Sequence, residues 1–552
     1  MTMMAFPLTL TSMFRRGIDL FPGKEIVSRR ASGELVRQSY QQFGERTARL
    51  AGALRRLGVA PGERVGTVAW NQHRHLEAYF AVPCSGAVLH TLNLRLFPDQ
   101  LVYIINHAED RVLLIDEDLA PIIEAIADRL PTVRQYVVMA DGPLPPTTLA
   151  PVWSYEELLA EADPHFAWPE DLDENAPSAM CYTSATTGNP KGVTYTHRSQ
   201  YLHSMCVGLA DSLALCERDV VLPFVPMFHV NAWGLPHAAI WYGATLVLPG
   251  PRPDAKAVLD LIQGERVTVP AGVPTIWLAC VPLLERREHD LSSVRAIPCG
   301  GSAIPPALIE KYDSFGLPFL QAYGMTETSP LASICRLKSH LAALPLDQTV
   351  ATRAKQGLPM PGVEIRLVDD TGNLAPRDGK SYGEVVMRGP WIADEYYHDE
   401  RTAQQFHDGW LHSGDIATWD EEGYMQIVDR TKDLVKSGGE WISSVELENA
   451  IMAIPGVAEA AIIGVAHPTW QERPLACVVP TPTHRDSLTA EHILAPLCAH
   501  FAKWWIPDAV VFIDEVPKTS VGKFSKRALR ERFAEYYLEA LDTSLTLVPP
   551  RG

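Results

Sequence analysis

Apolar positions along the chain follow two periods, one typical of helices and one of strands. Phe43, Leu50, Leu54 and Leu57 recur at helical spacing, and Gly58 can end that helix. Short apolar runs typical of strands cover residues 64–69, 111–116, 244–248, 267–270 and 294–298. Alternation of strands and helices on this scale predicts α/β layers with a mainly parallel sheet.

The pattern changes at about Val363. Residues 363–368 and 383–388 alternate apolar and polar positions, and the turn signal Thr371-Gly372-Asn373 separates them. This alternation predicts a β-rich subdomain.

A further boundary is expected near residues 429–433, beyond which a compact α/β unit begins. Ser443 and Glu446 have capping-box spacing at the start of a helix, and Gly456 can end it. The other elements expected there are strands over 460–465 and 475–479 and a last helix over about 525–541.

Composition narrows the class of protein. The 552 residues are too many for one compact core, so two or more domains are expected. With 48 Lys and Arg against 66 Asp and Glu, the net charge of -18 argues against a nucleic-acid partner. Nine scattered cysteines without a CxxC pair fit the reducing cytoplasm. We expect no signal peptide, and no apolar run reaches the ~18 residues of a membrane span.

The most informative segment is residues 182–192, Tyr-Thr-Ser-Ala-Thr-Thr-Gly-Asn-Pro-Lys-Gly. Its hydroxyls and backbone N–H groups can surround a polyphosphate, and its lysine can reach the terminal charge. The spacing is not that of a Walker loop. Alone, the segment also fits an ordinary polar turn, because its residue types are turn formers. The candidate phosphate ligands are Thr183, Ser184, Thr186, Thr187, Gly188 and Lys191.

Two further segments suit flat or apolar ligands. Residues 225–233, Val-Pro-Met-Phe-His-Val-Asn-Ala-Trp, fit a channel for an apolar acyl chain, although a lone histidine in such a stretch is usually a core residue. Gly300-Gly301-Ser302-Ala303 follows an expected strand, and glycines let a backbone approach a flat ligand closely. A plain strand–helix turn fits these four residues as well.

Two polar segments suit nucleotide chemistry. Residues 321–328, Gln-Ala-Tyr-Gly-Met-Thr-Glu-Thr, offer a ring that can stack on a purine and a carboxylate that can hold Mg²⁺. His412-Ser413-Gly414-Asp415 ends in a carboxylate, which can accept hydrogen bonds from paired ribose hydroxyls. Taken alone, this tetrapeptide also fits a turn.

The last two motifs contain lysines. Residues 429–443 run Asp-Arg-Thr-Lys-Asp-Leu-Val-Lys-Ser-Gly-Gly-Glu-Trp-Ile-Ser, and residues 517–523 run Pro-Lys-Thr-Ser-Val-Gly-Lys. As charge patterns, both also fit solvated surface loops. A positioned lysine can stabilise negative charge that develops during a reaction.

Together these motifs resemble those of the adenylate-forming enzymes, which include acyl-CoA synthetases, luciferases and peptide-synthetase adenylation domains. The resemblance runs from about residue 25 to 540, in family order. Residues 225–233 and 429–443 are most similar to bacterial medium- and long-chain fatty acyl-CoA synthetases.

The resemblance implies an α/β (multi-domain α+β) fold. A large N-terminal AMP-binding domain of two α/β subdomains plus a distorted β-barrel is expected over residues 1–430, a hinge over 431–433, and a small mobile C-terminal α/β domain over 434–552.

The resemblance also implies roles for single residues. His229 is expected beside the substrate carboxylate, Trp233 as the gate of the acyl tunnel, and Lys523 between the carboxylate and the α-phosphate. Thr183 and Glu327 are the implied Mg²⁺ ligands. The implied catalytic residues are Lys523, His229, Thr326 and Glu327.

The implied ATP- and AMP-binding residues come from several motifs. Tyr323 is expected to stack on adenine, and Asp415 and Arg430 to bind the ribose. Further implied contacts are Thr183, Ser184, Thr186, Thr187, Gly188, Lys191, Gly301, Ser302, Ala303, Gln321, Ala322, Gly324, Met325, Thr326, Ile427, Lys432, Lys436, Trp441 and Lys523. Lys432 is also the implied hinge pivot. Ser437, Gly438 and Gly439 are implied to line the coenzyme A path.

The implied reaction has two steps. A carboxylate attacks the α-phosphorus of Mg·ATP and gives acyl-AMP and pyrophosphate. The C-terminal domain then turns about Lys432, withdraws Lys523, and lets the thiol of coenzyme A form acyl-CoA and AMP. We therefore expect an AMP-forming acid–thiol ligase, an ATP-dependent medium- to long-chain fatty acid–CoA ligase that is a cytoplasmic homodimer with at most peripheral membrane contact.

Alternative functions stay open at this point. The substrate is alternatively a short, sulfur-bearing (methylthiopropionate-like) or aryl carboxylic acid. A separate carrier protein as acyl acceptor and a luciferase-like oxidation are further alternatives. A non-catalytic nucleotide sensor is disfavoured because Lys523, Glu327 and Asp415 are all present.

Two places depart from the family pattern, and the one that matters is Ala185, which stands where the family usually has glycine. The other, Gln471-Glu472-Arg473-Pro474, stands where Gly-Glu is more usual before the proline and puts little in doubt. A methyl group at position 185 can restrict a φ > 0 conformation or crowd the phosphates. We hypothesise slower loop movement or weaker ATP binding, with a tolerated small side chain as the alternative. An Ala185→Gly variant with unchanged ATP KM and kcat would remove the hypothesis.

Overall fold

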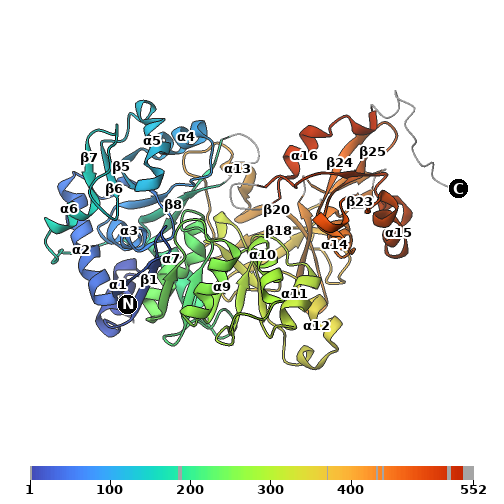
Figure 1. The fold of residues 1–552 in the computed structure, drawn as a ribbon, viewed down its shortest axis with the longest axis horizontal. Helices are drawn as coiled ribbons and strands as arrows, with labels where there is room; N and C mark the ends of the chain where they lie inside the picture. The colour runs from blue at the N-terminus through green and yellow to red at the C-terminus, as the bar shows by residue number, and fades with distance from the viewer. Residues whose placement is uncertain are drawn as a thin grey trace. The chain divides into compact units, whose positions relative to one another are not determined.

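The computed structural model describes residues 3–183, 189–369, 371–430, 433–437, 440–518 and 524–538. The chain divides into two compact units. The first comprises Met1–Ile365 and Met387–Leu411, and the second comprises Arg366–Val386 and His412–Gly552. Both mix helices and strands, which confirms the α/β multi-domain prediction (Figure 1).

The first unit contains a seven-stranded sheet in the order β7-β6-β5-β3-β4-β8-β9. Neighbouring strands are parallel except β8 and β9, so the predicted mainly parallel sheet is confirmed. Its strands are β3 (Arg64–Val68), β4 (Val88–Thr91), β5 (Asp110–Asp116), β6 (Gln135–Met139), β7 (Val152–Ser154), β8 (Pro177–Tyr182) and β9 (Gly192–Thr196). The phosphate-loop motif connects β8 and β9, which pair antiparallel.

Two smaller sheets complete the first unit. One has the order β12-β10-β11-β1-β2, and the other has the order β13-β14-β15-β16. The strands of the first are β1 (Glu25–Arg29), β2 (Leu35–Ser39), β10 (Val220–Pro223), β11 (Thr245–Leu248) and β12 (Val269–Ala271). Those of the second are β13 (Ile297–Cys299), β14 (Phe319–Gly324), β15 (Leu331–Ile334) and β16 (Leu358–Pro359).

Helices connect these strands and cover the sheets. Ser39 caps α2 in a capping box with Gln42, and the helix ends before Gly58, where φ is 86°. The helices of this unit are α1 (Leu10–Leu20), α2 (Tyr40–Arg56), α3 (His73–Cys84), α4 (Pro98–Ala108), α5 (Ala120–Glu124), α6 (Tyr155–Ala160), α7 (His197–Val207), α8 (Leu235–Tyr242), α9 (Ala255–Gly264), α10 (Pro274–Leu284), α11 (Pro306–Asp313), α12 (Leu346–Arg353) and α13 (Thr402–Gln405). No helix in the described ranges is long and apolar enough to cross a membrane.

The β-rich region predicted after Val363 is confirmed. Its sheet has the order β17-β18-β20-β19, and β21 also pairs with β20. The strands are β17 (Glu364–Val368), β18 (Gly383–Arg388), β19 (Phe406–His407), β20 (Trp410–Trp419) and β21 (Met425–Arg430).

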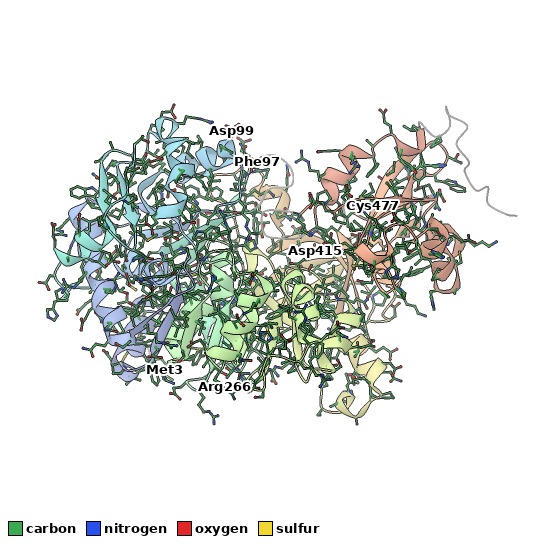
Figure 2. All side chains as sticks on the ribbon, viewed as in Figure 1. Met3, Phe97, Asp99, Arg266, Asp415 and Cys477 are labelled. Atoms are coloured by element: carbon green, nitrogen blue, oxygen red, sulfur yellow. The ribbon has the colours of Figure 1, made fainter. Side chains whose placement is uncertain are left out.

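The C-terminal part of the second unit is a sheet with helices on both faces (Figure 1). Its order is β23-β22-β25-β24, with β26 beside β25. Ala476 and Val478 of β25 pack in one apolar cluster, whereas Leu475 and Cys477 pack in another. Figure 2 labels Cys477 in this sheet. Both faces are buried because successive side chains of a strand point to opposite sides. The elements are β22 (Val435–Ser437), β23 (Glu440–Ile442), β24 (Val457–His467), β25 (Gln471–Pro480), β26 (Ala509–Phe512), α14 (Ser444–Met452), α15 (Ala490–His500) and α16 (Lys526–Arg532).

The last helix predicted over about 525–541 starts where expected but is not continuous. Helix α16 ends at Arg532, residues 533–535 form a turn, and residues 536–538 are helical again. Residues 539–541 lie outside the described residues. The Tyr537 hydroxyl donates a buried 2.8 Å hydrogen bond to the carbonyl oxygen of Pro474. Ser443 caps α14 as expected, and its side chain accepts from the Glu446 backbone N–H.

Candidate active site

The two ends of the phosphate-loop motif are fastened to each other. The backbone N–H of Thr183 donates to the Lys191 carbonyl oxygen at 2.9 Å, and the N–H of Lys191 donates to the Thr183 hydroxyl at 3.2 Å. Tyr182, which precedes the loop, lies with its hydroxyl 2.7 Å from Nδ1 of His107. The loop therefore leaves and re-enters the sheet at fixed positions.

The side chain of Lys191 lies against an aromatic ring. Its Nζ is 4.4 Å from the ring centroid of Tyr396 and 3.5 Å from Oε1 of Gln405. Burial lowers the pKa of Lys191, and the nearby Glu327 carboxylate opposes that shift. A half-buried ammonium group over a ring is a suitable partner for a phosphate.

Glu327 lies in a short 3-10 turn, Thr326–Thr328, and its side chain is buried. The Tyr396 hydroxyl donates to Oε1 of Glu327 at 2.6 Å, and the Ala393 N–H donates to the Glu327 carbonyl oxygen at 2.8 Å. The Tyr195 hydroxyl donates to the Thr326 carbonyl oxygen at 2.8 Å. Burial and the Glu327 carboxylate both raise the pKa of Tyr396, so the phenol stays a donor.

The donor set fits a magnesium ion that is held mainly by its substrate. No group of three or more His, Cys, Asp or Glu side chains in the described residues could hold a metal ion by itself. Glu327 offers one oxygen-rich group, and Mg²⁺ is usually bound through one or two carboxylates plus substrate phosphates.

The glycine segment and β14 approach each other closely. A Cβ on Gly300 would lie 2.6 Å from the Ala322 carbonyl oxygen, so a side chain there would collide with the backbone of β14. The Ile304 N–H donates to the side-chain oxygen of Gln321 at 2.9 Å. This contact fixes residues 300–304 against the strand that carries Tyr323.

The segment that carries Trp233 is a left-handed turn. Val230, Asn231, Ala232, Trp233 and Gly234 all have positive φ, between 39° and 69°. Such a conformation costs roughly 1–2 kcal/mol for each non-glycine residue. A Cβ on Gly300 would lie 3.6 Å from Cη2 of Trp233, so the indole lies close to the glycine segment.

Buried polar side chains hold the chain that leads into this turn. The Asn71 amide donates to the carbonyl oxygens of Pro223 and Val225 at 3.0 and 2.8 Å and accepts from the Met227 N–H at 2.7 Å. Tyr79 donates to the carbonyl oxygen of Met227. His229 immediately precedes the left-handed turn in an extended conformation, and it is partly exposed.

In the second unit, Asp415 of β20 is the direct cross-strand partner of Arg430 of β21. Arg430 Nε lies 3.1 Å from Asp415 Oδ1, and Asp415 is 5% exposed. The Ser413 hydroxyl accepts from the Asp415 N–H at 3.0 Å and donates to the Val385 carbonyl oxygen at 2.6 Å. The carboxylate is therefore held at one end of the strand pair.

Ser437, on the expected coenzyme A path, is tied to a buried arginine. Arg473 Nη1 donates to its hydroxyl at 3.0 Å, and the same guanidinium lies 2.7 Å from Asp508. Several other expected site residues lie outside the described residues: Ser184, Ala185, Thr186, Thr187, Gly188, Lys432, Gly438, Gly439 and Lys523. The same holds for the side chains of Lys436 and Trp441.

The first unit thus brings together Thr183 with Lys191, and Lys191 with Glu327 around Tyr396. Tyr396 was not among the residues singled out from the sequence, because 69 positions separate it from Glu327 and no local motif contains both. Tyr195 and Arg473 were missed for the same reason. A tyrosine or arginine outside a motif carries no sequence signal of the contact it makes.

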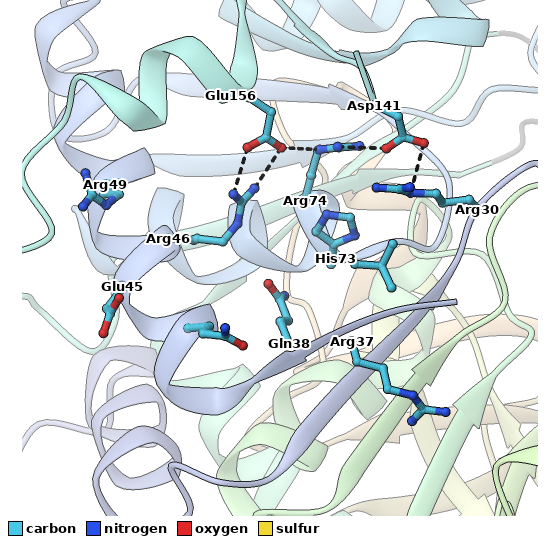
Figure 3. A pocket seen from close by; sticks show the side chains of 12 residues that line it. Arg30, Arg37, Gln38, Glu45, Arg46, Arg49, His73, Arg74, Asp141 and Glu156 are labelled. Atoms are coloured by element: carbon cyan, nitrogen blue, oxygen red, sulfur yellow. Dashed lines mark hydrogen bonds and ion pairs between the residues drawn. The ribbon is translucent and has the colours of Figure 1, made fainter. Parts of the chain in front are cut away.

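A separate pocket of about 440 Å³ lies in the first unit among residues of β2, α2 and α3 (Figure 3). Arg46 Nη1 lies 2.8 Å from Glu156, Arg74 Nε lies 2.8 Å from Glu156, and Arg74 Nη2 lies 2.9 Å from Asp141 (Figure 3). Arg30 Nε lies 3.3 Å from Asp141. Arg30, Arg46 and Arg74 each face a carboxylate, and the lining contains no residue of the motifs. The pocket wall is therefore a network of ion pairs that supports the fold.

Three relatives resemble the chain over almost their whole length. The long-chain-fatty-acid–CoA ligase of Thermus thermophilus is 51% identical over 97% of this chain and 97% of its own. The medium-chain-fatty-acid–CoA ligase of Ectopseudomonas oleovorans is 42% identical over 98% of each chain. The 3-methylmercaptopropionyl-CoA ligase of Ruegeria pomeroyi is 43% identical over 97% of this chain and 98% of its own.

Two solved structures share the fold. An anthranilate CoA ligase in complex with anthranoyl-AMP has a TM-score of 0.86 and 27% identity over 97% of this chain and 99% of its own. ATP-bound MatB from Rhodopseudomonas palustris has a TM-score of 0.82 and 27% identity over 96% of this chain and 100% of its own.

Two family descriptions match the chain itself. Residues 14–397 match the AMP-binding enzyme family, and residues 446–523 match the AMP-binding enzyme C-terminal domain. The chain belongs to the AMP-binding enzyme family, which is the adenylate-forming superfamily that its motifs resemble.

Proposed function

We propose that this chain is an ATP-dependent fatty acid–CoA ligase. One arrangement carries the proposal: the ring of Tyr396 lies against Lys191, and its hydroxyl donates a hydrogen bond to Glu327. Lys191 is also at one end of the phosphate loop, bonded to Thr183 at the other end. The arrangement offers one cation for a phosphate and one carboxylate for the metal that accompanies it. The family and the CoA-ligase relatives support the same reaction.

The reaction proceeds in two displacements. A carboxylate oxygen attacks the α-phosphorus of ATP, the bond from that phosphorus to the bridging oxygen breaks, and pyrophosphate leaves with the electron pair. The sulfur of coenzyme A then attacks the acyl carbon, the bond from that carbon to the AMP oxygen breaks, and the thiol proton is lost. Positioning and charge stabilisation, rather than covalent catalysis by side chains, account for the rate.

In this proposal, Lys191 and the hydroxyls and N–H groups of residues 183–188 bind the phosphates. Tyr323 and residues 301–303 bind adenine, and Asp415 with Arg430 binds the ribose. The buried carboxylate of Asp415, held beside Arg430, supports its role as an acceptor for paired hydroxyls.

Glu327 and Thr183 would hold Mg²⁺, which supplies charge neutralisation on the phosphates when it is bound. Tyr396 orients the Glu327 carboxylate through the 2.6 Å hydrogen bond to its Oε1. Thr326, held by the Tyr195 hydroxyl through its carbonyl oxygen, contacts the α-phosphate. His229 lies at the acyl side, next to the carboxylate of the acid.

Lys523 and the hinge residue Lys432 act in a domain alternation between residues 1–430 and 434–552. Lys523 neutralises charge during adenylation and is withdrawn before thioester formation. The segment of Ser437, Gly438 and Gly439 then lines the coenzyme A path. The bond from Arg473 to Ser437 supports a fixed start for that segment.

A fatty acid is the favoured acyl substrate because the relative with the highest identity of the three is a long-chain fatty-acid ligase and another is a medium-chain ligase. A short sulfur-bearing acid is the second candidate, since a 3-methylmercaptopropionyl-CoA ligase is 43% identical. None of the nine cysteines, all of which lie in the described residues, forms a disulfide, which supports action in the reducing cytoplasm. Association as a homodimer is part of the proposal and is checked by sedimentation.

Exchange of radiolabelled pyrophosphate into ATP tests the adenylation step. The proposal predicts exchange that requires a fatty acid and does not require coenzyme A. Exchange at the same rate without any acid would contradict it, because adenylate formation would then not be the reaction observed.

A further inference from the structure

Asn231 occupies an unusual place between two parts of the first unit. It lies in the left-handed turn of residues 230–234, two residues before Trp233, and is 1% exposed. Asparagine is among the few non-glycine residues that tolerate this backbone conformation. Its backbone fits the turn, and its side chain extends away from the turn into the seven-stranded sheet.

The side-chain oxygen of Asn231 is held by two neighbouring strands. Cys181 Sγ of β8 donates to Oδ1 at 3.2 Å, and the Thr91 hydroxyl of β4 lies 3.5 Å from the same oxygen. Thr91 Oγ1 and Cys181 Sγ are 3.1 Å apart, and the two residues are direct partners in the parallel β4–β8 pair. Burial raises the pKa of the Cys181 thiol to about 11, so the thiol remains a donor.

The other end of the turn lies against the candidate site. Cη2 of Trp233 approaches the position of a Cβ on Gly300 to 3.6 Å, and Gly300 itself lies against the backbone of Ala322. Ala232, between the two, is fully buried. A change in the position of Asn231 is therefore transmitted through one buried residue to the indole.

We propose that Asn231 is a specificity-determining positioning residue, whose amide anchors the Trp233 turn to Cys181 and Thr91 and so sets the acyl-chain length that the site accepts. This inference rests on the proposed function and adds to it a residue that contacts neither ATP nor the acid. Without the anchor, the strained turn relaxes and the indole no longer stays beside Gly300.

The test is the ratio of kcat/KM for a long to that for a short fatty acid, with the ATP KM measured in parallel. Asn231→Gly removes the anchor but keeps the backbone free to adopt positive φ. We expect the ratio to change by about 10-fold or more, because altered contacts in an apolar pocket change substrate discrimination by about that factor. The ATP KM should stay within about 3-fold of the wild-type value. Thr47→Val, which removes a fully buried hydroxyl in α2, is the control and leaves the ratio unchanged.

A double variant tests whether Asn231 acts through the indole: Asn231→Gly is repeated in a Trp233→Ala background. The inference predicts that Asn231→Gly no longer shifts the kcat/KM ratio in that background, because the indole through which it acts is absent. A shift of the same size in both backgrounds would overturn the inference. So would an Asn231→Gly enzyme that loses activity equally with all acids, since that result describes a merely structural residue.

A second pair of variants decides the matter if Asn231→Gly does not fold. Cys181→Ser keeps a hydrogen-bond donor and should keep the wild-type ratio, whereas Cys181→Ala removes the donor and should shift it. Equal ratios in these two variants would overturn the inference. The wild-type enzyme is assayed first with the same acids, and no turnover of any fatty acid would refute the proposed function and the inference together.

Discussion

The hydroxyl of Tyr396 donates a 2.6 Å hydrogen bond to Oε1 of Glu327. The ring of the same tyrosine lies 4.4 Å from Nζ of Lys191. One side chain thus orients the candidate metal ligand and packs under the candidate phosphate ligand. This relationship connects residues 191, 327 and 396, which are far apart in the sequence.

Tyr396→Phe keeps the ring beneath Lys191 and removes the hydrogen bond to Glu327. A hydrogen bond to a charged group is worth about 1.5–3 kcal/mol, so we expect the Mg²⁺ concentration for half-saturation to rise about 10-fold or more. The measurement is a Mg²⁺ titration of ATP binding by calorimetry and of the initial rate. Tyr397→Phe, at the neighbouring position, is the control. Identical Mg²⁺ titrations for wild type and Tyr396→Phe would show that the hydroxyl does not orient Glu327.

Trp233→Ala should change the chain-length profile more than the binding of ATP. Removing the indole opens space beside Gly300, so acids of a different length gain access, and we expect the ratio of kcat/KM between long and short acids to move by about 10-fold. The measurement compares kcat/KM across fatty acids with the ATP KM. Trp153→Ala, at a position that is 41% exposed in β7, is the matched control. An unchanged profile in Trp233→Ala would refute the gate role.

Much of the fold and of the phosphate-loop ends could be predicted from the sequence, because these features are local. The runs at 64–69 and 111–116 are β3 and β5, since period and residue type decide short buried strands. The run at 294–298 was predicted to begin earlier than β13, which starts at Ile297. Val294 is buried in the same apolar cluster as Ile297 but lies before the strand. An apolar run does not distinguish a buried residue in a strand from a buried residue that precedes one.

Other parts of the site could not be predicted. Nothing in a Val-Asn-Ala-Trp run indicates positive φ at every residue, because valine, alanine and tryptophan strongly disfavour it and only tertiary contacts impose it. The bond of Tyr396 to Glu327 depends on how distant segments pack. Each is a tertiary effect without a local signal.

Lys523→Ala should impair the two half-reactions unequally. A lysine that neutralises charge during adenylation is expected to be worth about 100-fold or more in that step, whereas thioester formation from supplied acyl-AMP should change little. The measurement is the single-turnover rate of each half-reaction. Lys518→Ala is the matched control, because Lys518 precedes the same segment and lies 2.6 Å from Glu459. Equal losses in both half-reactions would contradict the assignment of Lys523.

The ion-pair network of the separate pocket should give the fold an acid-sensitive stability. Burial would raise the pKa of Glu156, but hydrogen bonds from Arg46 and Arg74 outweigh it and lower the pKa to about 2. Because the folded-state pKa lies below the usual value of about 4.3, this stabilisation is present above that value and is lost as the pH falls towards 2.

Glu156→Gln should therefore lower the urea midpoint at pH 7, and the difference from wild type should shrink as the pH falls below about 4.3. Because the carboxylate is partly exposed, we expect about 1–2 kcal/mol at neutral pH. Glu45→Gln, at an exposed position of the same pocket, is the control. A difference that stays constant from pH 7 to pH 3 would show that the charge of Glu156 is not what stabilises the network.

The central claim is that this chain joins a fatty acid to coenzyme A through an acyl-adenylate. The most direct measurement is AMP release from ATP across fatty, short sulfur-bearing and aryl acids, each with and without coenzyme A, together with the acyl-CoA formed. The account predicts AMP and acyl-CoA in equal amounts, only with coenzyme A present, and fastest with fatty acids of one length range. Fastest turnover with a short or aryl acid, or AMP release that ignores coenzyme A, would contradict it.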